Sequence, residues 1–313
     1  MRQIDANPVT DRSPSAHSAI RHALSFDIED WFHIVQVKGL EHEHWDDLTK
    51  QHTLVERRTD EILEICEEAG VKATFFVLGW IAERYPSLLQ RIAQGGHELA
   101  SHGHMHDRVG LLGPGGFAQD LKRSIEAIGS ACGVRVRGYR APSFSIVQGC
   151  EWAFDVMEEC GIEWDASLFP ASRGHGGYPC PREPHVVSSP GGARIHELPM
   201  SVWTPFAYDI VRMGFSGGGY LRLLPYWILK RALADEAAAG RSTVVYLHPR
   251  DLAADCPRWP MPLHRRFKCY VGLASTREKL RRLLADEQWG PCGPHLAHSL
   301  SNAGTHPEWS LST

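Results

Sequence analysis

Several features that would place this chain outside the cell or in a membrane are missing. Its 8 cysteines are scattered, with no CxxC pair and no spacing typical of a disulfide framework, so we expect reduced thiols. No apolar run approaches the roughly 20 residues of a membrane span. The first residues also lack the apolar stretch of a secretory signal peptide. These absences predict a cytoplasmic protein with no membrane span.

A basic excess is also missing. The chain has 33 Lys and Arg residues against 37 Asp and Glu residues, a net charge of −4. A nucleic-acid-binding protein would show the opposite balance or a basic stripe, so nucleic acid is not an expected partner. Hydrophobic residues make up 43% of the 313 residues, which is enough for one large core.

Short apolar runs alternate with helical patterns along most of the chain. We expect strands at 22–27, 71–78, 97–101, 134–139, 162–166, 195–202 and 243–247. We expect helices at 59–69, 81–93, 116–132, 151–160, 220–239 and 276–285. This alternation predicts βαβ units and a parallel sheet, and about seven such units favour a barrel over an open sheet.

The two ends of the chain differ from this central part. Residues 1–20 are polar, with Pro and Ser, and we expect a flexible arm. Residues 288–313 are rich in Gly, Pro, Ser and His, and we expect a disordered tail without periodic structure. One domain, residues 21–287, would then contain the whole fold.

Five polar residues each sit at or just after the end of a predicted strand. They are Asp27, His102, Arg140, Asp165 and His248. In α/β barrels the chemistry lies at the carboxyl ends of the strands, so these side chains are expected to meet in one site.

Two of the motifs suggest a metal. In SHGHMH, His102 and His106 are four residues apart, and on a helical turn both imidazoles could share a divalent cation. In FDIEDW, the three acids Asp27, Glu29 and Asp30 follow a buried strand, which is unfavourable unless they are paired or bind something. Each pattern alone is also compatible with a surface cluster or a helix cap.

The remaining motifs become candidates for functional residues because of their order along the chain. Arg140, in GYRAPSF, could hold a carboxylate through two hydrogen bonds. His248 follows a β-branched run directly and precedes Pro249. A lone residue of either kind is more often structural than catalytic, but all five motifs occur in order after strands.

Together these motifs resemble a known family. The segments concerned are FDIEDWFH, ASHGHMH, YRAPSFS, WDASLFP, GGGYLRLLPY, YLHPRD and RFKCYVGLASTREKLRRLL. They are similar to the NodB-homology domain of polysaccharide deacetylases, carbohydrate esterase family 4, over about residues 22–286. The likeness is strongest to the branch found with exopolysaccharide and exosortase loci. It implies a distorted (β/α)7 barrel, with residues 21–287 as the catalytic domain.

The resemblance also implies residue roles. Asp27 matches the catalytic base, and Arg140 the arginine that orients it. His248 matches the general acid, and Asp165 the acid that partners it. His102 and His106 match the two metal-binding histidines, and the favoured divalent metal is Zn²⁺.

The third metal ligand stays open. The family has an adjacent acid pair, whereas here the run is Asp27-Ile28-Glu29-Asp30. Strand alternation puts Glu29 on the face of Asp27 if the strand persists that far. The shorter Asp30 fits the family's preference for aspartate, and we favour Asp30 slightly.

The resemblance implies a reaction and partners as well. The enzyme would remove N-acetyl groups from amino sugars of a polysaccharide or of its lipid-linked precursor, in association with exopolysaccharide biosynthesis proteins. The backbone N–H of Ser143 would help to bind the oxyanion, and Trp31 and Phe144 would stack on sugar rings. Two alternatives are a hydrolase of small cyclic amides with the same fold and a catalytically silent carbohydrate-binding protein.

Overall fold

The structure is a computed structural model, and it describes residues 21–171, 176–205, 212–302 and 308–311. The expected flexible arm, residues 1–20, lies outside the described residues. Within the described ranges, no helix combines the length and apolar character needed to cross a membrane. All eight cysteines are free thiols.

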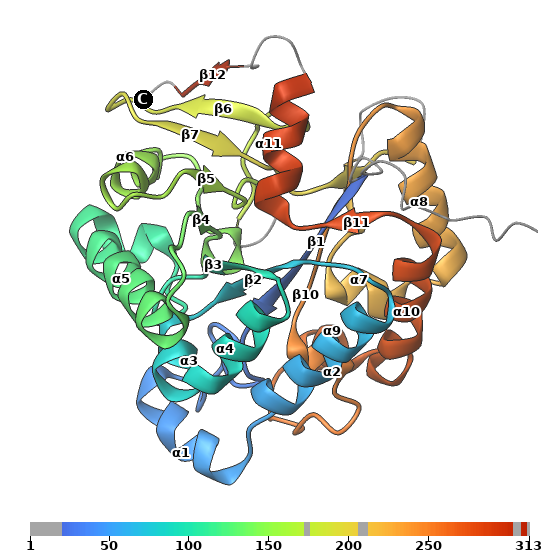
Figure 1. Cartoon of the computed structure of the whole chain (residues 1–313). Helices are drawn as coiled ribbons and strands as arrows, with labels where there is room; N and C mark the ends of the chain where they lie inside the picture. Colours follow the sequence, from blue (N-terminus) through green and yellow to red (C-terminus); the bar gives the residue numbers. More distant parts are fainter. Residues whose placement is uncertain (1–20, 172–175, 206–211, 303–307, 312–313) are drawn as a thin grey trace, which may run out of the picture.

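The centre of the fold is a mostly parallel sheet (Figure 1). The strands are β1 (His22–Ile28), β2 (Thr74–Val77), β3 (Glu98–Ser101), β4 (Gly138–Tyr139), β5 (Trp164–Asp165), β6 (His185–Ser188), β7 (Arg194–Glu197), β8 (Val202–Trp203), β9 (Met213–Gly214), β10 (Val244–Leu247), β11 (Trp289–Gly290) and β12 (Glu308–Ser310). The main sheet has the order β10-β1-β2-β3-β4-β5-β7-β6-β12, and β11 pairs with β1. The strands from β10 to β7 all run parallel, which confirms the predicted α/β class.

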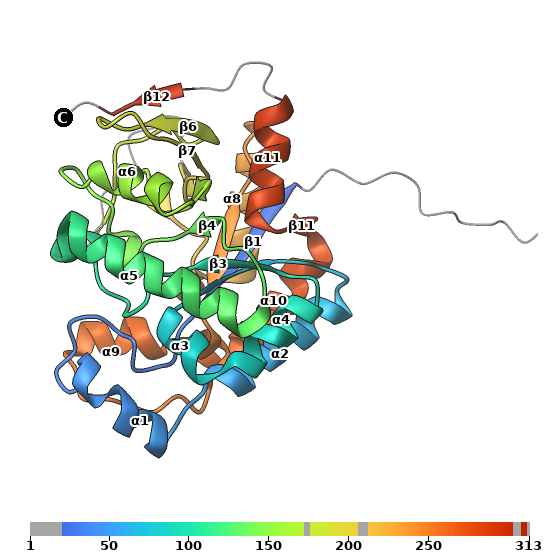
Figure 2. The same cartoon turned by 60° about the vertical axis from the view of Figure 1, so that its left-hand side comes forward.

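Helices surround this sheet (Figures 1 and 2). They are α1 (Trp45–Gln51), α2 (Val55–Glu68), α3 (Gly79–Arg84), α4 (Pro86–Gln94), α5 (Val109–Cys132), α6 (Trp152–Glu159), α7 (Gly218–Leu223), α8 (Tyr226–Ala238), α9 (Leu263–Tyr270), α10 (Thr276–Asp286) and α11 (Cys292–Asn302). Two expected helices are divided in the structure, at Pro86 and Pro225, because proline lacks the N–H that a continuous helix requires.

The barrel is closed incompletely. In the part of the chain that the structure describes, no strand ladder joins β7 to β10. Single contacts fill this gap instead. The amide of Tyr246 donates to the carbonyl of Ser216 at 3.0 Å, and the amide of Val244 donates to Oγ of Ser201 at 2.8 Å. The predicted distortion of the barrel is therefore concentrated between β7 and β10.

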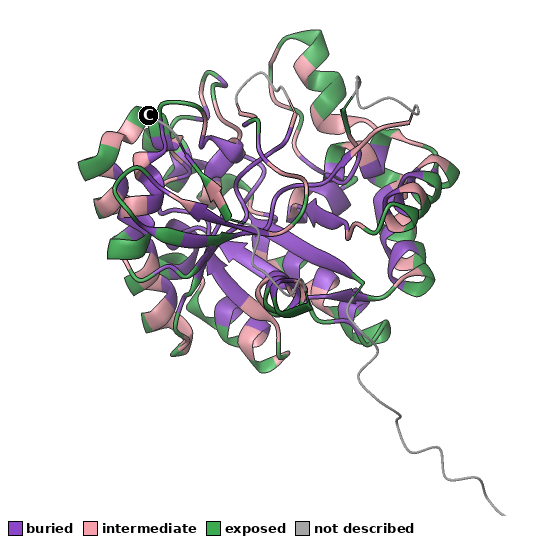
Figure 3. Ribbon diagram, turned by 90° about the horizontal axis from the view of Figure 1, so that it is seen from above, coloured by how far each residue is buried: buried purple, intermediate pink, exposed green. Residues whose placement is uncertain are grey.

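Buried residues form two cores on the two sides of the sheet. One lies between the strands and the outer helices and includes Leu24, Phe26 and Ile28 of β1. The other lies inside the barrel and includes Ala23 of β1. The residues two and four positions after Ala23 on β1 point inward as well, because side chains alternate along a strand. In the view from above, the buried strands occupy the middle and the exposed residues lie mainly on the outer helices (Figure 3).

The prediction of a disordered tail from residue 288 is wrong for the described part of that segment. Cys292, Leu296 and Leu300 of α11 join the core inside the barrel. The amide of Cys292 donates to Oγ of Thr74 at 2.7 Å, at the start of β2. Helix α11 therefore covers the amino-terminal end of the barrel, opposite the strand ends that carry the polar motifs.

Candidate active site

Strand β1 directs two acids into the barrel mouth. Asp27 is on the inward side of β1, and Glu29 follows directly after the strand, where its amide donates to the carbonyl of Asp27 at 3.0 Å. Oε1 of Glu29 lies 2.9 Å from Nε2 of His106 and 3.1 Å from Nε2 of His102. The side-chain atoms of these three buried residues that could bind a metal ion all lie within 4.8 Å of one another.

Asp30 has a different role, and the prediction that favoured it as the third ligand is wrong. Its carboxylate accepts hydrogen bonds from the hydroxyl of Thr53 and from the amides of Leu54 and Val55, at the start of α2. Burial raises the pKa of Asp30 despite these donors. Asp30 thus caps a helix, whereas the position of Glu29 follows strand alternation.

His102 is held in the orientation that a metal ligand needs. Its Nδ1 lies 2.8 Å from the carbonyl of Arg140, so Nδ1 carries the proton and the lone pair of Nε2 points toward Glu29. His106 has a φ of 58°, a left-handed backbone that is unusual for a residue with a side chain. That backbone turns its imidazole back toward His102, with the ring centroids 5.3 Å apart.

The charge of Glu29 also suits a cation site. Burial alone would raise its pKa, but the charges of the neighbouring His106 and His248 hold the pKa of Glu29 well below its usual value. Glu29 is therefore an ionised carboxylate in a buried position. Two imidazole nitrogens and one carboxylate are a donor set typical of a catalytic divalent metal with open coordination positions, so these residues fit the expected ion.

Arg140 fixes Asp27. Its fully buried guanidinium donates through Nη1 to Oδ1 of Asp27 and to Oγ of Ser25, both at 2.8 Å. Nε donates to the carbonyl of Ala166 at 3.2 Å, and the group stacks 4.0 Å above the ring of Phe76. The arginine can therefore hold Asp27 in one orientation, as the resemblance implied.

His248 faces the same acids across the site. Its Nε2 lies 3.9 Å from Oδ2 of Asp27 and 3.8 Å from Oε1 of Glu29. Burial lowers the pKa of His248, but the charges of Glu29, Asp251 and Asp27 outweigh this effect and raise the pKa above its ordinary value.

The partner of His248 is Asp251, and the prediction that assigned this role to Asp165 is wrong. Nδ1 of His248 lies 3.1 Å from Oδ2 of Asp251, in the 3₁₀ turn at Pro249–Leu252. Oδ1 of Asp251 is paired with Nε of Arg222 at 2.9 Å. The missed signal was within the YLHPRD motif, three residues after the histidine.

Asp165 instead supports the loop after β4. Its carboxylate accepts from the hydroxyl of Ser167 at 2.6 Å, and Oγ of Ser167 accepts from the amide of Ala141 at 2.7 Å. Asp165 also hydrogen-bonds the carboxyl of Glu197. Burial and the charge of Asp165 raise the pKa of Glu197 well above its usual value, so this pair retains a proton.

Only part of the expected sugar-binding set lies at the cavity. Ser143 and Phe144 line it, and both have positive φ values, 58° and 55°. Such strained backbone is common where a functional group must be aimed. Trp31, in contrast, is 3% exposed, contacts the rings of Phe32 and Trp259, and donates to the carbonyl of His52. The prediction that Trp31 lines the groove is wrong.

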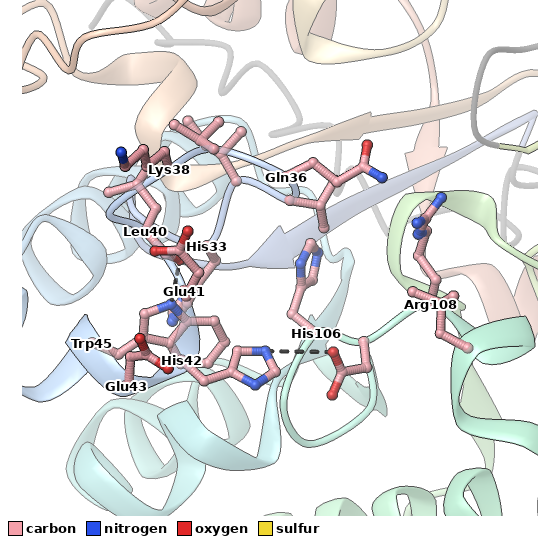
Figure 4. Close-up of a pocket in the computed structure, with 15 residues that line it drawn as sticks. His33, Gln36, Lys38, Leu40, Glu41, His42, Glu43, Trp45, His106 and Arg108 are labelled. Atoms are coloured by element: carbon pink, nitrogen blue, oxygen red, sulfur yellow. Dashed lines mark hydrogen bonds and ion pairs between the residues drawn. The ribbon is translucent and has the colours of Figure 1, made fainter.

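A cavity of about 510 Å³ surrounds this constellation, and Tyr246 and Lys268 also line it. A second hollow, of about 590 Å³, adjoins it (Figure 4). The two share His33, Ile34 and Val35 together with the candidate ligand His106. The candidate site is therefore one end of a longer depression.

The fold and the site define an α/β-barrel protein with a buried His-His-Glu cluster beside an acid and a histidine. Residues 42–162 match the family described as polysaccharide deacetylase, and residues 166–297 match a domain of unknown function, DUF3473. The first part of the chain is thus similar to polysaccharide deacetylases, the family that its motifs resemble. The His-His-Glu cluster precedes the boundary between the two matches, and His248 follows it.

Curated relatives agree with this identification. A chitooligosaccharide deacetylase of Rhizobium leguminosarum bv. trifolii is 38% identical over 74 residues, which are 24% of this chain and 34% of that protein. One from Sinorhizobium fredii is 36% identical over 100 residues, 32% of this chain and 44% of that protein. The similarity thus spans less than half the length of these relatives.

A solved structure has the same fold over nearly the whole chain. It is a candidate polysaccharide deacetylase from Mycobacterium smegmatis, with a TM-score of 0.63 and 20% sequence identity. The alignment covers 98% of this chain and 99% of that one. The likeness therefore extends through the DUF3473 segment and through α11.

Proposed function

We propose that this protein is a metal-dependent deacetylase that hydrolyses N-acetyl groups on amino sugars of a polysaccharide or of its lipid-linked precursor. One observation carries the proposal. The Glu29–His102–His106 cluster lies between an acid fixed by Arg140 and a histidine held by an aspartate. This arrangement provides a cation site, a base and an acid around one cavity.

The metal would be held by Nε2 of His102, Nε2 of His106 and the carboxylate of Glu29, and zinc is the favoured ion for this donor set. When bound, such an ion polarises the acetyl carbonyl and makes water more acidic. Exchange between zinc and other divalent ions would identify which of them supports turnover.

Two side chains of this protein then carry out the two proton transfers. Asp27, fixed through Oδ1 by Arg140, accepts a proton from the attacking water. The backbone N–H of Ser143 helps to stabilise the oxyanion. His248, with its pKa raised, donates a proton to the amide nitrogen as the C–N bond breaks. The products are acetate and a free amino sugar.

The adjoining hollow supports a polymeric substrate over a small cyclic amide. It extends the depression beyond the candidate ligand His106 and includes Gln36, Arg108 and the ion pair of His42 with Asp107, whose nearest atoms are 3.5 Å apart (Figure 4). These polar groups could contact the hydroxyls of a neighbouring sugar. The cytoplasmic location and the association with exopolysaccharide biosynthesis proteins are also part of the proposal, and their support is the resemblance of the motifs.

The test measures acetate release from N-acetylglucosamine oligomers of increasing length. We expect release that stops after thorough chelation, returns with zinc, and is abolished in Asp27→Asn while metal content is kept. Turnover that survives complete removal of metal, or near-normal turnover of Asp27→Asn, would contradict the mechanism. A preference for longer oligomers would support the polymeric substrate.

A further inference from the structure

Helix α9 has an uncovered apolar side. None of its residues is buried, and Leu263 and Phe267 are 79% and 56% exposed. Four residues apart, they lie on the same side of the helix. Arg265 points roughly the opposite way and donates to the carbonyls of Val35 and Gln36, both at 2.6 Å. The helix is thus attached through its polar side and presents Leu263 and Phe267 outward.

The chain around α9 is basic. Between Asp255 and Glu278 there is no acidic residue, although the chain as a whole has a net charge of −4. The same interval contains the cations Arg258, Arg265, Arg266, Lys268 and Arg277, of which Arg277 is paired with Glu61 of α2 at 2.6 Å. Arg266 is exposed and lies next to the apolar side of α9. Apolar side chains flanked by cations are typical of helices that lie in the interface of an anionic membrane.

This surface adjoins the mouth of the candidate active site. Lys268 of α9 lines the catalytic cavity, and so does Val35, whose carbonyl accepts from Arg265. A surface that is bound by α9 would therefore lie at the rim of the cavity. This is where a substrate attached to the same surface would enter.

We propose that α9 docks this protein on an anionic lipid surface. Leu263 and Phe267 insert at the level of the acyl chains, Arg266 meets the anionic headgroups, and the catalytic cavity opens beside the surface. The inference that the substrate is then a lipid-linked or membrane-proximal glycan rests on the proposed function. The docking itself does not depend on that function.

The experiment is co-sedimentation of the whole chain with vesicles of phosphatidylglycerol and phosphatidylcholine, compared with phosphatidylcholine alone. We expect binding to the anionic vesicles that weakens with added salt. Leu263→Ser/Phe267→Ser should bind at least tenfold more weakly, and Arg266→Glu several-fold more weakly. Arg137→Glu is the matched charge control, because Arg137 precedes β4 at the opposite end of the barrel and pairs with Glu163. It should bind like the wild type.

The outcomes distinguish an anionic lipid surface from a second copy of the chain as the partner of α9. Absence of binding to anionic vesicles, or unchanged binding of the double variant, would overturn the proposal. A dimer that the double variant dissociates, without vesicle binding by the wild type, would assign α9 to a second copy of the chain. The double variant should still deacetylate a soluble oligomer, because neither residue belongs to the site. Vesicle binding without any acetate release would refute the proposed function and leave the docking intact.

Discussion

His248 and Asp251 are joined twice within one 3₁₀ turn. Oδ2 of Asp251 lies 2.9 Å from the amide nitrogen of His248 and 3.1 Å from its Nδ1. The second contact puts a proton on Nδ1 when the imidazole is neutral and directs Nε2 toward Asp27. The other oxygen of Asp251 is held by Arg222. The orientation of the proposed general acid thus depends on a residue three positions along the chain.

Asp251→Asn should therefore reduce turnover by about 10- to 100-fold, a typical effect for a supporting carboxylate. Because Asp251 contributes to the raised pKa of His248, the alkaline limb of the pH–rate profile should move to lower pH in the variant. The measurement is kcat against pH. Asp165→Asn serves as the comparison and should leave that limb in place. An alkaline limb that moves in Asp165→Asn but not in Asp251→Asn would restore the original assignment.

Glu29 and Asp30 should separate metal binding from stability. Glu29→Gln removes the carboxylate that faces both histidines, so metal content after dialysis should fall at least tenfold. Asp30→Ala should keep the metal but lower the free energy of unfolding by about 2 kcal/mol, because the buried amides of Leu54 and Val55 lose their acceptor.

Elemental analysis and urea unfolding measure the two effects on the same preparations. Loss of metal in Asp30→Ala, when the protein remains folded, would contradict the assignment of Asp30 as a helix cap. Retention of metal by Glu29→Gln would remove Glu29 from the ligand set.

Periodicity predicted the sheet because its strands are buried on both faces and appear as continuous apolar runs. The same alternation predicted that Glu29 faces the same way as Asp27, and its carboxylate does lie beside His102 and His106, because β1 continues as far as Ile28. The preference for Asp30 came from the family pattern, in which the two acids are adjacent. Asp30 accepts hydrogen bonds from the start of α2, more than twenty positions away in the sequence. No sequence pattern near Asp30 therefore indicates these contacts.

The other errors also have physical causes. Helix α11 begins with Cys292, Gly293 and Pro294, and this start concealed the helical spacing of the buried residues that follow. Asp165 does lie at the end of a strand, as its motif indicated, but it contacts Ser167 rather than the histidine. Which of two acids meets a histidine depends on loop geometry, and the sequence does not encode that directly.

Leu296 tests the packing of α11. It is buried inside the barrel, so Leu296→Ala should lower the free energy of unfolding by about 2 to 4 kcal/mol. His298→Ala, at an exposed position of the same helix, should change it by less than about 0.5 kcal/mol. Equal stability of the two variants in urea unfolding would contradict the burial of α11.

The pair of Asp165 and Glu197 should make stability depend on pH. The pKa of Glu197 is well above its usual value in the folded state. The folded protein therefore holds a proton that the unfolded chain releases near pH 4.5. This contribution is fully present below that pH and is lost as the pH rises through the folded pKa. Stability should accordingly decline toward alkaline pH.

Glu197→Gln imitates the protonated acid and should remove much of this decline. The matched control is Glu163→Gln, because Glu163 pairs with Arg135 on the surface and surface pairs contribute little. Urea midpoints across pH 5 to 9 measure the effect. An alkaline decline in Glu197→Gln as steep as in the wild type would show that the pair holds no proton. If the pair does hold one, the variant should also keep acetate release at neutral pH, because Ser167 and Ala141 would stay in place.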